Sequence, residues 1–347
     1  MIKKEITDKV LSEHLSKIEK DGMSVFIMAD GRFRGAFFNG TELINQMRIQ
    51  HNLGLLETML LGQGILCAAL MIPTMKGKEH LVFRYDTNGS ARGFSVEANS
   101  TGYVRGFILN DHIPVEKPLD SWDLSAFLGD GTVSVSRLKE GAREPQTGTT
   151  EIIYKNIAQD LAYYFSQSEQ INTAFNTSIQ FDKEGRVIGA GGLFLQTIPV
   201  YGGKNNSEKS DKKNNAIKEF ADMAQEELIL KAENAFKAMP SIGQWFADKG
   251  TREDIVYGLF REFSPTIVLE RDIIFDCPCS MENFARQIKN LPKSEVESII
   301  KDKSTPLFVH CRSGARSAQA TSILKRMGYT NVEDIGGILS YRGKVVR

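Results

Sequence analysis

The sequence predicts an α+β fold with a mixed strand and helix core, and three observations lead to this prediction. Short β-rich runs come in pairs around turn dipeptides such as Asn88-Gly89, which is typical of antiparallel hairpins. Segments with the apolar spacing of helices stand between them, without the regular strand and helix alternation of a parallel sheet. The chain has 347 residues, a length that indicates two or three structural units.

The elements of the core are expected within residues 1–203. Thr41 is the predicted N-cap of a helix over 42–50, because a threonine hydroxyl accepts hydrogen bonds from the first backbone N–H groups of a helix. A further helix is expected over 156–167, where apolar residues recur at helical spacing. The predicted strands cover residues 24–29, 32–38, 81–85, 91–98, 102–109, 133–138, 175–181 and 186–195.

The longest apolar stretch, Leu53–Ile72, is nominally long enough to span a membrane. It contains Glu57, Gln63 and several glycines, which hydrocarbon tolerates poorly, so the prediction is a buried helix over 55–71. The charged N-terminal residues show no secretory signal, and we expect the reducing cytosol as the compartment.

The charge balance is neutral, since Lys plus Arg and Asp plus Glu both number 43. A protein that binds nucleic acid or an anionic membrane usually has a basic excess or basic blocks. Neither nucleic acid nor a membrane is therefore an expected partner.

The four cysteines are unevenly placed, because Cys277, Cys279 and Cys311 all fall in the last quarter of the chain. In a cytosolic chain they are not expected to form a static disulfide framework. Cys67, on the apolar helix, is predicted to be a small core residue. Cys277 and Cys279 have the C-x-C spacing that suits two thiolates on one zinc ion.

Several strings of residues are unusually specific. They lie at 54–69 (GLLETMLLGQGILCAA), 102–106 (GYVRG), 160–174 (DLAYYFSQSEQINTA), 190–199 (AGGLFLQTIP) and 275–280 (FDCPCS). Together they resemble the Hsp33 family of redox-regulated chaperones, in order over roughly residues 1–302. The resemblance implies an ATP-independent holdase, not an enzyme, that captures unfolding client proteins during oxidative stress and forms a homodimer when activated.

In that family a C-x-C pair and a distal C-x-x-C pair hold zinc when reduced and form disulfides when oxidised. The resemblance therefore makes Cys277 and Cys279 the redox sensors and zinc ligands of this chain. Structural zinc contributes roughly 10–16 kcal/mol in small peptides, whereas a whole domain is stable by about 5–15 kcal/mol. Loss of the metal on oxidation can consequently unfold a small domain.

The C-terminal segment departs from the family pattern, because no C-x-x-C pair follows Cys279. Residues 307–316 (LFVHCRSGAR) and 331–338 (NVEDIGGI) instead resemble the second half of a rhodanese domain. Cys311 lies close to the position of the family's third cysteine, so it is a candidate zinc ligand and redox partner. His310 is the candidate fourth ligand, and the alternatives are a weak or exogenous fourth ligand or no bound metal.

Cys311 also has an enzymatic interpretation, in which it is the nucleophile of a sulfurtransferase. Arg312, Arg316 and the start of the following helix would lower its thiol pKa and hold a sulfur-donor anion. A third alternative is a constitutive chaperone whose switch is degenerate, since the fourth cysteine is absent.

A helical middle region is expected between the core and the cysteines, after the polar linker 204–215. Its helices are predicted over 216–238, 242–247 and 252–260. We hypothesise that 216–260 covers an apolar surface at rest, because large exposed apolar patches lead to aggregation. The predicted domains are the core 1–203, the helical middle 204–270, the C-x-C redox segment 271–302 and the rhodanese-like fragment 303–347.

Overall fold

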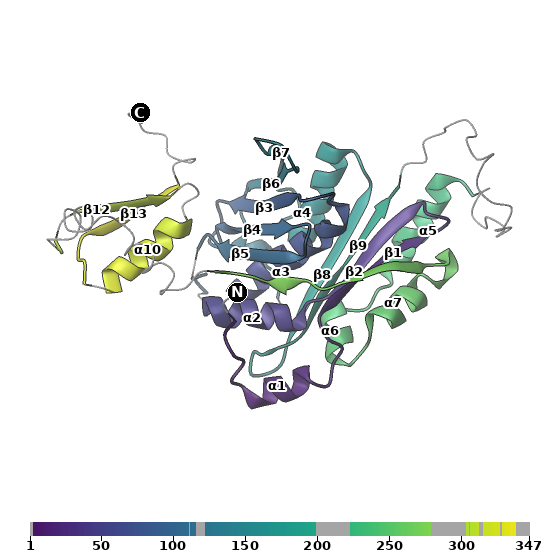
Figure 1. The fold of residues 1–347 in the computed structure, drawn as a ribbon, viewed down its shortest axis with the longest axis horizontal. Coiled ribbons are helices and arrows are strands. Elements are labelled where there is room, and N and C mark those ends of the chain that lie inside the picture. The colour runs from purple at the N-terminus through teal and green to yellow at the C-terminus, as the bar shows by residue number, and fades with distance from the viewer. Residues whose placement is uncertain are drawn as a thin grey trace. The chain divides into compact units, whose positions relative to one another are not determined.

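The computed structural model describes residues 3–110, 112–115, 122–198, 223–278, 303–304, 306–311, 315–326 and 328–337 (Figure 1). The chain divides into two compact units. The larger unit consists of Lys3–Gly106 and Asn110–Asp276, and the smaller one of Cys277–Arg347 with Met1–Ile2 and Phe107–Leu109. Helices and several sheets are combined in the way that the sequence predicts, which confirms the α+β class.

The first sheet of the larger unit has five strands in the order β10-β1-β2-β9-β8, and every pair of neighbours is antiparallel. The β1–β2 hairpin turns at Asp30-Gly31, as predicted, and Gly31 has the positive φ that this turn requires. β10 was not predicted from the sequence. The strands are β1 (Gly22–Met28), β2 (Phe33–Asn39), β8 (Thr173–Phe181), β9 (Val187–Thr197) and β10 (Thr266–Arg271).

The second sheet has six strands in the order β11-β5-β4-β3-β6-β7. The predicted hairpin at Asn88-Gly89 joins β3 to β4. β7 and β11 were not expected from the sequence, and β11 is only two residues long. The strands are β3 (His80–Thr87), β4 (Gly93–Asn99), β5 (Tyr103–Ile108), β6 (Gly131–Leu138), β7 (Gln146–Glu151) and β11 (Ile274–Phe275).

Helix α3 (Leu55–Met71) is the buried helix that the sequence predicts. The stretch Leu55–Thr74 is long and apolar enough to span a membrane, but 89% of its most apolar window is buried inside the protein. Gly62 and Gly64 bring α3 close to both sheets, because a Cβ atom there would meet Ile179 of β8 and Phe94 of β4 at 2.5 and 2.6 Å. α3 is therefore a core helix between the two sheets.

Helix α2 (Thr41–His51) corrects the predicted N-cap, which is Gly40 and not Thr41. The Thr41 hydroxyl is buried and donates to the Asn39 side chain at 2.7 Å. The first helical N–H groups are instead satisfied by the Asp21 carboxylate, which accepts from the backbone nitrogens of Glu42 and Leu43 at 2.9 and 2.7 Å. A residue distant in the chain thus replaces the local cap.

The remaining helices of the larger unit include α1, which precedes β1, and three helices that follow residue 222. α4 begins after its N-cap Asn156 and continues into a π-helical turn at Phe165–Glu169. The helices are α1 (Lys9–Leu15), α4 (Ile157–Tyr164), α5 (Gln225–Lys237), α6 (Ile242–Ala247) and α7 (Arg252–Leu259), with 3-10 turns at Ile72–Thr74, Ser125–Phe127 and Arg261–Phe263.

In the smaller unit, β12 (Leu307–Cys311) and β13 (Val332–Gly337) form a parallel pair, and α10 (Ala315–Arg326) connects them in the chain. A strand, a helix and a strand were expected in this order. The rhodanese resemblance itself stays a prediction, as do the three boundaries between the four predicted domains. The first of these boundaries lies within residues 199–222, outside the described residues.

Candidate functional site: a covered apolar sheet and the cysteine segment

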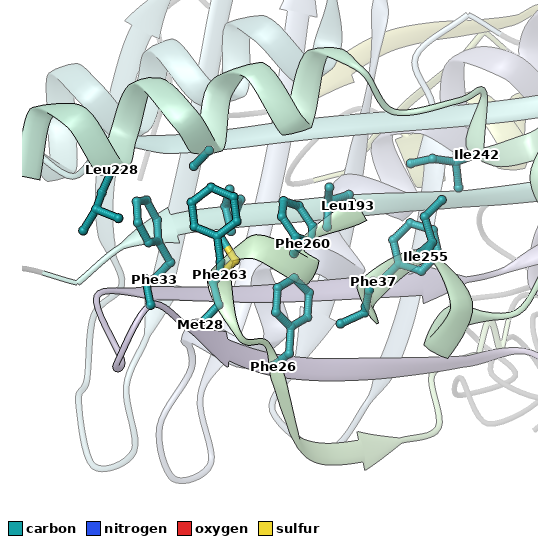
Figure 2. Close-up of a cluster of buried hydrophobic side chains, with 14 of the residues drawn as sticks. Phe26, Met28, Phe33, Phe37, Leu193, Leu228, Ile242, Ile255, Phe260 and Phe263 are labelled. Carbon is teal, nitrogen blue, oxygen red and sulfur yellow. The ribbon is translucent and has the colours of Figure 1, made fainter. Parts of the chain in front are cut away.

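One face of the five-stranded sheet is apolar and is covered by the segment that follows residue 222. In Figure 1, α5, α6 and α7 lie alongside β1, β2 and β9. Figure 2 shows side chains of the sheet and of this segment pointing toward one another. The buried cluster consists of Phe26, Met28, Ala29, Phe33, Phe37, Leu193 and Leu195 from the sheet side and of Leu228, Ala232, Ile242, Phe246, Ile255, Val256, Phe260 and Phe263 from the covering side. We call residues 223–263 the helical cover.

Aromatic pairs join the cover to the sheet. Each pair combines one ring from β1 or β2 with one ring from α6 or from the residues that follow α7. Such pairs contribute about 0.5–1.5 kcal/mol beyond the apolar area that they bury. The pairs are Phe26 with Phe260 at 5.6 Å between ring centroids, Phe33 with Phe263 at 6.5 Å and Phe37 with Phe246 at 5.4 Å.

Helix α6 lies directly on the sheet because glycines remove the side chains between them. A Cβ atom at Gly189 of β9 would lie 1.9 Å from the Gly243 carbonyl oxygen. A Cβ atom at Gly191 would lie 2.5 Å from the Phe246 ring. Any larger residue at these two positions would therefore displace α6.

A polar contact holds the start of α7. Arg252 is 16% exposed at its side chain, and its Nε donates to the Ser24 hydroxyl at 3.1 Å. Its Nη1 donates to the Lys20 carbonyl oxygen at 3.0 Å. Its Nη2 lies 3.5 Å from the Glu19 carboxylate and 3.3 Å from that of Glu270 on β10. Arg252 thus ties the cover to β1, to the residues just before it and to the edge strand β10.

Burial alters the pKa of two acidic side chains beside this contact. Burial raises the pKa of Asp21 to about 7, and the two N–H groups of α2 oppose this rise only in part. Burial also raises the pKa of Glu19, while the Arg252 guanidinium lowers it by a smaller amount. Asp21, which caps α2 beside this contact, is therefore expected to change its protonation in the neutral range.

A short tether connects the cover to the cysteine segment. β10 follows the cover and pairs with β1, and β11 then pairs in parallel with β5 through Ile274 and Phe275. The Phe275 ring is buried and lies edge-on to His51, at 5.6 Å between ring centroids. Cys277 follows two residues later and is buried as well. The cover is thus separated from Cys277 by only two short strands.

The predicted site residues are described to different extents. Cys67 is buried in α3, which confirms its prediction as a core residue. Cys279 and Arg312 lie outside the described residues. His310 and Cys311 form the end of β12, and Arg316 lies in the first turn of α10, but only their backbones are described. The structure therefore does not test whether these side chains meet.

Zinc is the metal that the family pattern implies. Among the described residues, no group of three or more His, Cys, Asp or Glu side chains is placed to hold a metal ion. The donor chemistry of the cysteine segment still fits zinc, since a buried Cys277 and a second thiol two residues later supply soft ligands.

The comparison with known proteins identifies the family of this chain. A sequence model of the Hsp33 protein family matches residues 21–317. This chain belongs to the Hsp33 family. Its relatives include the 33 kDa chaperonin of Lactiplantibacillus plantarum, 28% identical over 78% of this chain and 84% of that protein, and that of Agathobacter rectalis, 29% identical over 79% and 88%.

The Hsp33 fold is also found in a solved structure. The crystal structure of the 33 kDa chaperonin from Thermotoga maritima matches with a TM-score of 0.66 and 26% identity, over 84% of this chain and 91% of that one. The family is one of chaperones, so this Hsp33 chain is a chaperone and its partners are client proteins.

Sequence reasoning missed two functional features of this Hsp33 chain. One is β10, although the β-branched and apolar run Thr266–Leu269 directly after Pro265 is typical of a strand. The other is the Arg252 contact, whose partners Glu19 and Ser24 lie about 230 residues away in the chain. No local signal in the sequence points to that contact.

Proposed function

We propose that this Hsp33 chain is an ATP-independent holdase that oxidation activates, in the cytosol. The observation that supports the proposal is the helical cover, because it buries an apolar sheet face and leads through a short tether into the cysteine segment. A surface that is hidden at rest and exposed on demand can bind unfolded chains without causing aggregation in the resting state.

The trigger in this proposal is the thiol pair Cys277 and Cys279, with Cys311 as a further participant. In the reduced protein these thiols would hold zinc as thiolates, with His310 as the candidate fourth ligand. Zinc supplies folding free energy to the segment that binds it. A peroxide would then take two electrons from the two thiolates and two protons from solvent, and leave as two molecules of water while the disulfide forms and the thiols no longer hold zinc.

The signal would pass to the cover through the tether. When the cysteine segment loses its fold, β11 loses its C-terminal attachment, and its two residues alone cannot hold β10 and the cover in place. The cover then opens, and the cluster around Phe26, Phe33 and Phe37 meets solvent and clients. We further propose that the activated protein forms a homodimer, and that neither nucleic acid nor a membrane is its partner.

A sulfurtransferase activity is the second candidate function, and one observation favours it. Cys311 ends β12 and α10 begins at Ala315, so Cys311 stands in the chain between the end of a strand and the start of a helix. Helix N-termini bind anions and lower thiol pKa values. Arg312 and Arg316 would then hold the sulfur donor. Turnover of thiosulfate and cyanide that is lost in Cys311→Ser would establish this activity.

The holdase proposal is tested by light scattering of a chemically unfolded protein diluted into reduced or peroxide-treated samples. We expect suppression of aggregation only after oxidation in the wild type, and one zinc ion per reduced chain by atomic absorption. The double variant Cys277→Ser/Cys279→Ser should contain no zinc, while Cys67→Ser is the matched control that keeps both properties. Equal suppression by reduced wild type, oxidised wild type and the double variant would favour the constitutive chaperone.

A further inference from the structure

β10 is an edge strand of the five-stranded sheet among the described residues. It pairs antiparallel with β1 from Met23 opposite Arg271 to Ile27 opposite Thr266, with one register shift. Its side chains stay largely in solvent, since Val268 is 53% and Leu269 is 50% exposed. Backbone pairing therefore holds β10 in place more than side-chain burial does.

The exception is Ile267, which packs against the buried cluster beneath the helical cover. It lies opposite Phe26 in the register of β1. β10 thus shows which kind of segment the edge of β1 accepts. Such a segment is extended, completes the backbone hydrogen bonds of β1, and places an apolar side chain beside Phe26 from every second position.

β10 also belongs to the part of the chain that opens in the proposed function. The cover ends at Phe263, three residues before β10, and β11 begins three residues after it. Once the cover and the cysteine segment have both lost their folds, the parts of the chain before and after β10 no longer hold it against β1. Its departure leaves a row of unpaired N–H and C=O groups along β1, next to the apolar cluster.

We propose that the edge of β1, once β10 has left it, binds an extended apolar segment of the unfolding client by strand addition. The inference rests on the proposed holdase function and names its substrate: chains rich in β-branched and apolar residues that can form one more strand. An extended client satisfies the backbone groups of β1 and places alternate side chains at Phe26 and Met28. A helical client does neither, because its own backbone is already paired.

The first test locks β10 to β1 with the disulfide of a Val25→Cys/Leu269→Cys variant, since these residues lie opposite each other. The matched control is Val25→Cys/Ala36→Cys, which shares one substitution and links β1 to β2 instead. The probe is reduced, carboxymethylated α-lactalbumin, which stays unfolded, and its affinity for each oxidised variant is measured by fluorescence anisotropy. We expect at least a tenfold weaker affinity for the β10-locked variant.

The locked variant could bind the probe weakly because β10 blocks the edge of β1 or because the cover does not open, and the second test distinguishes these two explanations. A peptide of residues 264–273 (SPTIVLERDI) competes with the probe for the oxidised wild type. Two further peptides contain N-methyl groups at 269 and 271 or at 270 and 272. Their side chains are identical, but successive backbone N–H groups of a strand point to opposite edges. We expect one methylated peptide to compete at least tenfold more weakly than the other.

Each result decides between the claims. Equal affinities of the two locked variants, or equal competition by the two methylated peptides, would overturn strand addition and leave the holdase function standing. An oxidised wild type that does not bind the probe would overturn both. A homodimer that the peptide dissociates while probe binding is unchanged would assign the edge to a second copy of the chain and overturn the proposal for clients.

Discussion

Phe260 joins the cover to the sheet, because its buried ring contacts Phe26 of β1 and also Phe263 within the cover. Its ring contributes to the closed state of the cover but not to the packing of α3 between the two sheets. The buried phenylalanines therefore fall into two classes. In the proposed function, those beneath the cover control exposure of the apolar surface, and those elsewhere control only global stability.

The first prediction compares Phe260→Ala with Phe194→Ala. Both rings are buried, and each truncation should cost about 3–5 kcal/mol. Phe194 packs against Phe175 and lies outside the cluster beneath the cover. We expect Phe260→Ala to suppress aggregation even when reduced, and Phe194→Ala to be less stable but inactive until oxidised. The same activity in both reduced variants would mean that general destabilisation exposes the surface.

The second prediction concerns Asp21, whose pKa burial raises to about 7 in the folded protein from 3.8. The folded state therefore binds this proton more tightly than the unfolded chain does. Stability from Asp21 is fully present below about pH 4 and is lost as the pH rises to about 7, by at most about 1.4 kcal/mol per pH unit.

Asp21→Asn should make this decline shallower, since an amide does not ionise. The measurement is the urea midpoint of wild type and variant at pH 5 and pH 8. We expect the wild type to lose more stability than the variant between these two values. If wild type and Asp21→Asn differ in stability by the same amount at both pH values, this result would contradict the raised pKa.

At the scale of elements, α5 is the most weakly attached helix of the cover. Only Leu228 and Ala232 of its thirteen residues are buried, whereas α3 is buried at almost every position. A buried leucine contributes roughly 1.5–3 kcal/mol, so local opening of α5 requires far less free energy than global unfolding.

The third prediction is a gradient of amide hydrogen exchange in the reduced protein. Amides of α5 should exchange at least about 100-fold faster than those of α3, and those of α6 should lie between, because α6 is packed backbone to backbone on β9 through Gly189 and Gly243. Mass spectrometry of peptides from 225–237, 242–247 and 55–71 measures all three. Equal protection of α5 and α3 would show that the cover and core open as one unit.

Elements with strong local signals could be predicted from the sequence. The bounds of α3 and α6 are as predicted, because each has a continuous apolar or helical pattern with a clear start and stop. β7 and β11 were missed since one is polar and exposed and the other has only two residues. β10 was missed although the run Thr266–Leu269 has the pattern of a strand, and only its pairing with β1, more than 200 residues away, could not have been read from the sequence.

The candidate site was predictable only in outline. The resemblance places the switch at Cys277 and Cys279, and composition marks 216–260 as a cover. The aromatic pairs, the contact of Arg252 and the capping of α2 by Asp21 all depend on tertiary packing. Such contacts cannot be derived from local pattern, because the residues that form them are brought together only by the folded sheet.

At the scale of the whole molecule, the account links three parts in series: a cysteine segment, a tether of two short strands, and a helical cover over an apolar sheet. Each part is stabilised by the next, so loss of fold at the cysteines should spread through β11 and β10 to the cover but stop at β1 and the rest of the two sheets. The extensive burial of α3 between the sheets sets this limit.

The most direct test of this link is amide hydrogen exchange before and after peroxide treatment, in the wild type and in Cys67→Ser as control. The account predicts that peptides from 223–263 and from β10 lose protection after peroxide, while α3 keeps it. Unchanged protection across 223–263 in a protein whose Cys277 and Cys279 have been oxidised would contradict the account.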